Sequence, residues 1–248
     1  MGFGNFLEIR VIRIIRLIIF MQISGFLKFS MIDYPGKLSA VVFTQGCDFR
    51  CPYCHNPELV VIKKGTISEK ETIDFLKTRK GKLEGVVITG GEPTIQKDLK
   101  SFIRKTKKLG FKIKLDTNGS HSDILKNLIK EKLVDYIAMD IKSPFEKFQM
   151  DKVQSSKFKV QIKKSIELIM NSKIKYEFRT TIVKGDLNQK DIVEIAKSIK
   201  GARLYVLQKF KKSKHLNRQY KNAKTLSDRE FQSIKKKIKK YVREVKIR

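Results

Sequence analysis

The sequence predicts an α/β fold in which parallel strands are joined by crossover helices. The first observation is a regular alternation: from residue 37 onward, short apolar runs rich in β-forming residues alternate with amphipathic stretches. Such alternation is typical of parallel sheets with right-handed crossovers. The second observation is that polar residues gather where the predicted strands end. Six strand–helix units fit either an open barrel or a doubly wound sheet, and periodicity alone does not decide between the two.

The predicted elements follow one another in a simple order. Six apolar runs are predicted as strands: residues 38–45, 85–90, 111–119, 134–142, 175–183 and 202–210. Five amphipathic stretches are predicted as helices: residues 68–79, 95–110, 121–132, 161–171 and 188–200. The first helix begins with a capping box, Ser68 followed by Glu71, and Gly110 ends the second. After a polar, lysine-rich loop, residues 227–239 are predicted as a last helix and residues 241–248 as a short edge strand.

The polar residues at the strand ends are candidates for a functional site, because parallel α/β folds place their sites at the carboxyl ends of strands. These residues lie after or near the predicted strand ends: residues 46–54, 89–93, 116–119 and 140–142, with Arg179 inside the fifth strand and Gln208 near the end of the sixth. We therefore expect a site at this edge of the sheet.

The composition indicates a folded and strongly basic protein. Hydrophobic residues make up 41% of the 248, so a sizeable core is possible, and the charged fraction of 32% is interspersed with apolar runs. The formal net charge is +30. This charge fits a generally lysine-rich surface, docking to an acidic protein partner, or binding to nucleic acid. The lysines are spread over nearly every segment, which favours the first two interpretations.

The N-terminal stretch, residues 1–20, is apolar but does not fit the pattern of a membrane-spanning helix. Four charged side chains interrupt it: Glu8, Arg10, Arg13 and Arg16. A spanning helix needs about 20 mostly apolar residues, and the apolar run 17–21 is too short for a signal peptide and lacks a following cleavage site. An amphipathic surface helix is one interpretation. We expect instead that the protein starts at Met21, with residues 1–20 as an extension and residues 21–248 as a single domain.

The three cysteines, Cys47, Cys51 and Cys54, lie within eight positions, and the rest of the chain has none. An odd number of clustered thiols fits a metal site in a reducing compartment better than a disulfide framework. Four interpretations are open. They are covalent haem at C-x-x-C-H, a structural zinc site that includes His55, a redox pair of Cys51 with Cys54, and an iron–sulfur cluster with one iron left open.

The spacing C-x-x-x-C-x-x-C after the first strand, with Tyr53 before the third cysteine, resembles the radical S-adenosylmethionine (SAM) superfamily. "GGEP" at residues 90–93 matches the second signature of that superfamily. Further segments, "SMIDYPGKLSAVVFTQGCDFRCPYCHNPELV", "DTNG", "MDIK", "EFRTTIV" and "YVLQKF", together resemble the activating proteins of anaerobic ribonucleoside-triphosphate reductases. The resemblance runs from about residue 25 to the C-terminus. It implies an open partial (β/α)6 barrel of the radical SAM type.

The resemblance implies a cofactor site. A 4Fe–4S cluster would be held by three thiolates: Cys47, Cys51 and Cys54. SAM would bind the open iron, in a pocket formed by Tyr53, Gly90, Gly91, Glu92, Asp116, Thr117, Asn118, Asp140, Lys142 and Arg179. Tyr53 would touch the adenine, the two glycines would admit the methionine end, Glu92 would hold the amino group or brace the turn, and the cations would meet the carboxylate. His55 would shape the turn behind the third cysteine.

Several of these residues also have simpler interpretations. Asp140 and Lys142 fit a surface ion pair, and Asn118 followed by glycine is a common turn signal. Thr117 fits a helix cap. No side-chain acid or base is implied beyond the cluster ligands.

The reaction that the resemblance implies needs protein partners. A flavodoxin or ferredoxin would reduce the cluster, SAM would be cleaved to a 5′-deoxyadenosyl radical, and this radical would take a hydrogen atom from a glycine of the anaerobic reductase. No nucleic acid or membrane partner is expected, and the location is expected to be cytoplasmic. Two alternatives remain: a radical SAM enzyme acting on another glycyl-radical enzyme or on a small molecule, as 7-carboxy-7-deazaguanine synthase does, and a basic RNA-binding protein with a zinc knuckle.

Overall fold

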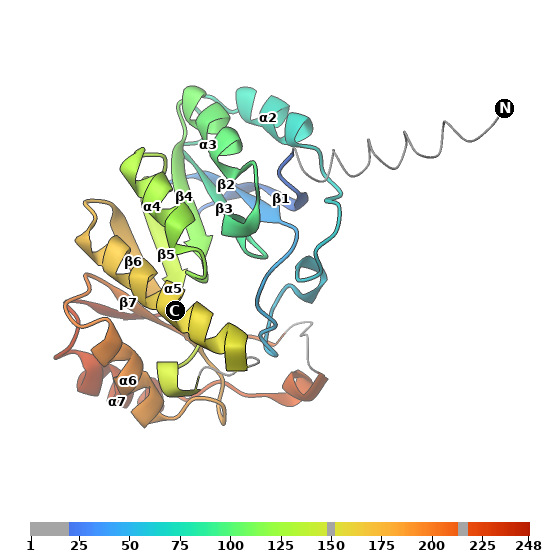
Figure 1. The fold of residues 1–248 in the computed structure, drawn as a ribbon. Helices are drawn as coiled ribbons and strands as arrows, with labels where there is room; N and C mark the ends of the chain where they lie inside the picture. The colour runs from blue at the N-terminus through green and yellow to red at the C-terminus, as the bar shows by residue number, and fades with distance from the viewer. Residues whose placement is uncertain (1–19, 148–151, 213–217) are drawn as a thin grey trace. The chain divides into compact units, whose positions relative to one another are not determined.

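The computed structural model of the protein describes residues 20–147, 152–212 and 218–248 (Figure 1). The chain has an α/β fold with an eight-stranded, mostly parallel sheet, in the order β1-β2-β3-β4-β5-β6-β7-β8. The order begins with β1 and ends with β8, so the described strands form an open sheet and no closed barrel. This confirms the predicted fold class. Except for Phe20, the predicted extension 1–20 lies outside the described residues.

The chain divides into two compact units. Of the described residues, the first comprises residues 20–49 and 58–114, and the second comprises residues 50–57 and those from 115 onward. The prediction that residues 21–248 form a single domain stays a prediction. Within the described residues, no helix combines the length and the apolar character that crossing a membrane requires.

The first unit is built on two buried parallel strands. β2 (Ser39–Thr44) pairs in parallel with β3 (Gly85–Gly90), and most residues of both are buried, as is usual for parallel strands. β1 (Ile23–Ser30) pairs antiparallel with β2 and was not predicted, because Gly25 and Lys28 interrupt its apolar run. The unit's helices are η1 (Pro57–Leu59, which begins in the second unit), α2 (Glu69–Lys77), η2 (Pro93–Ile95) and α3 (Leu99–Lys108).

The start of α2 depends on a side-chain cap, whereas α3 starts later than predicted. Ser68 accepts a hydrogen bond from the main-chain nitrogen of Glu71 at 3.0 Å, which is one of the two bonds of the predicted capping box. The prediction that the next helix starts at residue 95 is wrong, because Pro93–Ile95 form a separate short turn and α3 begins at Leu99. Gly110 ends α3 with a φ of 97°, as predicted.

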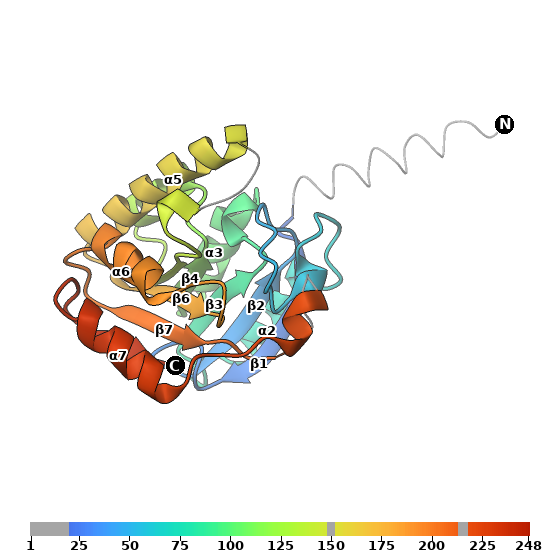
Figure 2. The same cartoon turned by 90° about the horizontal axis from the view of Figure 1, so that it is seen from below.

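The second unit contains parallel strand pairs covered by helices. Its strands are β4 (Lys112–Thr117, which begins in the first unit), β5 (Tyr136–Asp140), β6 (Lys175–Ile182), β7 (Tyr205–Lys209) and β8 (Val245–Ile247). Its helices are α4 (Ser122–Lys130), η3 (Phe145–Lys147), α5 (Lys152–Asn171), α6 (Gln189–Ser198), η4 (Arg218–Asn222) and α7 (Asp228–Ile238). α4 packs against α5 and α6 against α7 (Figure 1). Figure 2 shows α6, α7 and β7 from below. The predicted edge strand is confirmed as β8, which pairs in parallel with β7.

Candidate functional site

The loop that carries the cysteines begins directly after β2 with a hydrogen-bonded base. The main-chain nitrogen of Gly46 donates to the oxygen of Leu59 at 2.7 Å, and that of Cys47 donates to the oxygen of Val60 at 3.1 Å. Gly46 has a φ of 97°, which favours glycine at this turn. These two bonds therefore join the start of the cysteine loop, after β2, to the segment at Leu59 and Val60 that ends it. We call residues 45–47 and 58–61, all in the first unit, the loop base.

The three cysteines are half-buried, and none is in a disulfide. Cys47 belongs to the first unit, and its sulfur accepts a hydrogen bond from the main-chain nitrogen of Phe49 at 3.4 Å. Cys51 and Cys54 belong to the second unit, where the nitrogen of Cys54 donates to the oxygen of Cys51 at 3.0 Å. Among the described residues, no group of three or more histidine, cysteine, aspartate or glutamate residues is arranged to hold a metal ion.

The donor set nevertheless fits an iron–sulfur cluster in its chemistry. Thiolates are the usual ligands of cluster irons, and three partly accessible thiols that form no disulfide supply them. That the three cysteines act together as ligands stays a prediction.

Gly90 and Gly91 let the ends of β2 and β3 come close together. A side chain on Gly91 would overlap the carbonyl oxygen of Gly46, and one on Gly90 would overlap the backbone of Thr44. The nitrogens of Gly91 and Glu92 donate to the oxygens of Thr44 and Gly46 at 2.9 and 2.8 Å. The glycines therefore have a structural role in the backbone, and their predicted contact with SAM stays a prediction.

Glu92 is buried, with 1% of its surface exposed, and it braces the turn that follows β3. Its Oε1 accepts a hydrogen bond from the main-chain nitrogen of Thr94 at 3.0 Å and another from the hydroxyl of that residue. This corresponds to one of the two roles expected for it, and a contact with an amino group stays a prediction.

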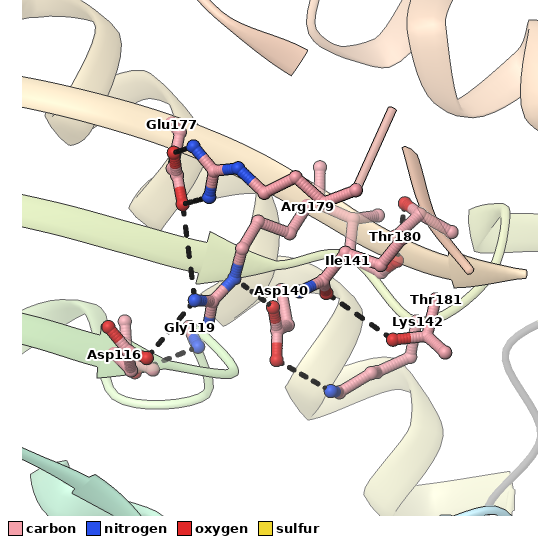
Figure 3. A network of polar contacts seen from close by, with 12 residues as sticks. Asp116, Gly119, Asp140, Ile141, Lys142, Glu177, Arg179, Thr180 and Thr181 are labelled. Atoms are coloured by element: carbon pink, nitrogen blue, oxygen red, sulfur yellow. Dashed lines mark hydrogen bonds and ion pairs between the residues drawn. The ribbon is translucent and has the colours of Figure 1, made fainter. Parts of the chain in front are cut away.

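Four of the predicted pocket residues belong to one charged network in the second unit (Figure 3). Arg179 donates from Nε to Asp140 at 2.7 Å and from Nη1 to Asp116 at 3.1 Å, and Lys142 donates to the other oxygen of Asp140 at 2.8 Å. These residues come from β4, β5, β6 and the residue pair that follows β5. Sequence separation between them reaches 63 residues, and the parallel strand order brings them together.

The charges in this network stabilise one another against burial. Burial alone would raise the pKa of the Asp140 carboxyl, but Arg179 and Lys142 outweigh it and hold that pKa well below its usual range. Burial likewise opposes the charged forms of Lys142 and Arg179, but the neighbouring carboxylates dominate and raise the pKa of both. The side chains of Asp140 and Lys142 are 23% and 24% exposed, so the pair is not a freely solvated surface contact.

Two members of the network, Glu177 and Arg248, were not predicted from the sequence. Glu177 on β6 is completely buried and receives two hydrogen bonds from Arg248, at 2.9 and 2.8 Å. The hydroxyl of Tyr136 donates to the same carboxylate at 3.0 Å, and Nη1 of Arg179 lies 4.0 Å from it. The only sequence signal was the position of Glu177 two residues before Arg179, which places both on one face of β6.

We use the term charge network for six residues: Asp116, Asp140, Lys142, Glu177, Arg179 and Arg248. It holds three carboxylates and three cations, so its formal charges cancel.

Tyr53 lies beside the charge network within the second unit. Its hydroxyl is 3.4 Å from the carbonyl oxygen of Lys142, to which it donates, and its ring centroid is 6.1 Å from that of Tyr220. Burial raises the pKa of Tyr53, and the negative charge of Cys51 adds to the shift. His55 is exposed and packs edge-on against Phe210 at 5.8 Å.

Thr117 and Asn118 shape the turn after β4. The Thr117 hydroxyl accepts a hydrogen bond from the nitrogen of Gly119 at 3.1 Å, and the Asn118 side chain accepts one from the nitrogen of Ser120 at 2.9 Å. This is the local turn chemistry that such residues commonly provide. Their predicted place in a SAM pocket stays a prediction.

Comparison with known proteins identifies the family. The pattern of the Radical SAM superfamily matches residues 41–199. A Methanocaldococcus jannaschii protein, provisionally named a glycyl-radical enzyme activating enzyme, is 37% identical over 233 residues, covering 91% of this chain and 95% of its own length. The pyruvate formate-lyase 1-activating enzyme of Escherichia coli K12 is 26% identical over 173 residues, covering 66% of this chain and 68% of its own length.

A solved structure shows the same fold. Streptococcus suis SuiB bound to S-adenosylmethionine matches with a TM-score of 0.59 at 15% identity, over 82% of this chain and 48% of that one. At this identity the likeness concerns the fold alone.

The chain belongs to the radical SAM superfamily. Membership implies a 4Fe–4S cluster and SAM as cofactors, and the three cysteines within eight positions agree with it.

Proposed function

We propose that this protein activates a glycyl-radical enzyme, and that its target is an anaerobic ribonucleoside-triphosphate reductase. The observation that carries the general proposal is the 37% identity to an activating enzyme over 91% of this chain and 95% of the relative. The segments "SMIDYPGKLSAVVFTQGCDFRCPYCHNPELV" and "YVLQKF" support the particular target, because they resemble the activating proteins of that reductase.

When bound, the cluster and SAM supply the radical chemistry that removes a hydrogen atom from a glycine of the target. The thiolates of Cys47, Cys51 and Cys54 would hold three irons. Gly90 and Gly91 let the turn after β3 pack closely against Thr44 and Gly46, and Glu92 keeps that turn in place, where its backbone would face the methionine end of SAM.

The charge network would form one side of the SAM pocket, with its side chains held in fixed positions. Its carboxylates and cations are already paired with one another, so they need no rearrangement to hold their positions when a ligand arrives. Tyr53 is tethered to the main chain of Lys142 and would present its ring to the adenine. Asp116, Thr117 and Asn118 would complete this side of the pocket after β4.

The partners would be the reductase and a small acidic electron carrier, a flavodoxin or ferredoxin. The formal charge of +30 supports an acidic carrier, because complementary charge speeds association. A cytoplasmic location follows from the clustered thiols as part of the same proposal.

The test is electron paramagnetic resonance spectroscopy of a candidate target incubated anaerobically with the reconstituted protein, SAM and a reductant. A glycyl-radical signal is expected with the anaerobic reductase and not with pyruvate formate-lyase. Cys51→Ala should abolish the signal, whereas Lys70→Ala, at a side chain that is 88% exposed, should leave it unchanged. A signal with pyruvate formate-lyase alone would overturn the proposed target, and SAM cleavage with no radical on either enzyme would overturn activation itself.

A further inference from the structure

We propose that Gln45 is a positioning residue that closes the cysteine loop and so sets the geometry in which the thiols hold the iron–sulfur cluster. This inference rests on the proposed cofactor site. Gln45 is not itself expected to touch the cluster or SAM; it acts through the main chain on either side of the loop.

The side chain of Gln45 bridges the two ends of the loop. It follows β2 directly and is 2% exposed. Its Nε2 donates to the carbonyl oxygen of Glu58 at 3.0 Å and to that of Val61 at 2.6 Å. One amide therefore satisfies two main-chain acceptors that lie 13 and 16 residues further along the chain. The donor is buried although Glu58 and Val61 are exposed, and a buried amide N–H without an acceptor is strongly disfavoured, so the side chain of Gln45 keeps both bonds.

The main chain of Gln45 is held as firmly as its side chain. Its nitrogen donates to the oxygen of Gln22 at 2.8 Å, and its oxygen accepts a hydrogen bond from Nε2 of Gln96 at 2.8 Å. The two neighbouring glutamines are tied as well, because Oε1 of Gln96 accepts from the nitrogen of Gln22, and Oε1 of Gln22 accepts from the nitrogen of Gly65, both at 3.0 Å. Gln45 is thus fixed before it reaches across the loop base.

The closure acts on the segment that carries two of the three cysteines. The first unit contributes residues up to Phe49 and again from Glu58, and Arg50–Pro57 between them belong to the second unit. Gln45, with the main-chain bonds of Gly46 and Cys47, therefore joins the two ends of the loop that contains Cys51 and Cys54. Fixing the ends of a short loop removes much of its conformational freedom, which lowers the entropic penalty of holding three thiolates on one cluster.

A neutral amide suits this position. Glutamine supplies two N–H donors and no charge, so the closure does not depend on pH and adds no net charge beside the thiolates. A glutamate at the same position would oppose two carbonyl oxygens with further acceptors.

The experiment compares Gln45→Leu with the wild-type protein and with Thr72→Val. Thr72 is fully buried in α2, and its hydroxyl donates to the oxygen of Ser68, so the control also removes a partly buried hydrogen bond, but one outside the cysteine loop. After anaerobic reconstitution, the rate at which iron is lost to a chelator is measured. In the metal-free proteins, the rates at which iodoacetamide alkylates Cys51 and Cys54 are measured by peptide mass spectrometry, with circular dichroism to confirm folding.

We expect Gln45→Leu to lose iron about ten-fold faster than wild type, and its two cysteines to be alkylated several-fold faster, because two acceptors lose their donor. Thr72→Val should match wild type in both rates. A Gln45→Leu protein with wild-type rates overturns the inference, and so does a Thr72→Val protein with rates raised equally.

Gln45→Asn provides a second route if Gln45→Leu does not fold. It keeps the amide but shortens the side chain, so it should show raised rates in a folded protein, and wild-type rates would overturn the inference. Failure of the cofactor proposal is distinguishable: a wild-type protein that takes up no iron contradicts the proposed function, while the alkylation rates, which need no iron, still decide the role of Gln45.

Discussion

The loop base and the charge network are both held together by polar contacts, but they are built from opposite chemistry. In the loop base, a neutral amide donates to main-chain oxygens, and every partner lies in the first unit. In the charge network, charged side chains meet charged side chains within the second unit, and three negative charges balance three positive ones. The two regions therefore show two ways of fixing polar groups: neutral hydrogen bonds hold the ends of the cysteine loop, while paired charges hold side chains of neighbouring strands in place.

The strongest way to break the charge network is to remove the charge of Glu177. We expect Glu177→Gln to lower the free energy of unfolding by about 3 kcal/mol, because Arg248 and Arg179 would then face a neutral, buried partner. Denaturant titration measures the change.

The control for that substitution is Glu194→Gln. Glu194 pairs with Lys197 on the surface of α6, where the side chains are 50% and 49% exposed, and its loss should change stability by less than about 0.5 kcal/mol. Equal effects at the two positions would contradict the special role given to the buried charges.

A substitution at Gly91 tests how tightly the chain packs against the loop base. Gly91→Ala should destabilise the protein by about 2 to 3 kcal/mol, because the added methyl group would overlap the carbonyl oxygen of Gly46 at the loop base. Thermal unfolding measures the change.

Gly110→Ala is the matched control for Gly91. Gly110 has a φ of 97° but open space around the position of a side chain, so strain in the backbone alone should amount to about 1 kcal/mol. If the two alanines were equally destabilising, close packing at the loop base would not be the reason for glycine.

The smallest expected difference between the charge network and the loop base lies in how their contributions to stability depend on pH. The pKa of Asp140 is depressed in the folded protein, so its stabilising contribution is complete above the unfolded pKa of about 3.9 and is lost as the pH falls toward the folded value. The stability difference between wild type and Asp140→Asn should therefore be constant from about pH 5 to 7 and shrink below about pH 4.

Gln45→Leu should show no such trend over the same range, because the amide does not titrate. Urea titrations at several pH values measure both differences. A difference for Gln45→Leu that follows pH as that for Asp140→Asn does would remove the distinction between the two regions.

The sequence predicted the buried strands well because their apolar runs are short and sharply bounded. It missed β1, whose glycine and lysine break the pattern, and it started α3 too early because the short turn at Pro93–Ile95 resembles a helix start. Tertiary context decides both cases.

The site residues divide in the same way. Asp116, Asp140 and Lys142 were singled out because they stand at or near predicted strand ends, where the fold class expects a site, and Arg179 because it lies inside a predicted strand. That these residues bind SAM stays a prediction. Glu177 was missed because its partner Arg248 is 71 residues away and meets it only through the pairing of β6, β7 and β8. Gln45 was missed because its partners are main-chain oxygens, which leave no pattern in the side-chain sequence.

The central claim is that Cys47, Cys51 and Cys54 together hold a 4Fe–4S cluster with one iron open to SAM. Iron and sulfide analysis of the anaerobically reconstituted protein tests it most directly. We predict roughly four irons and four sulfides per chain, with a sharp loss of both in each single cysteine-to-alanine variant. A single zinc ion per chain, with no sulfide, would contradict the account.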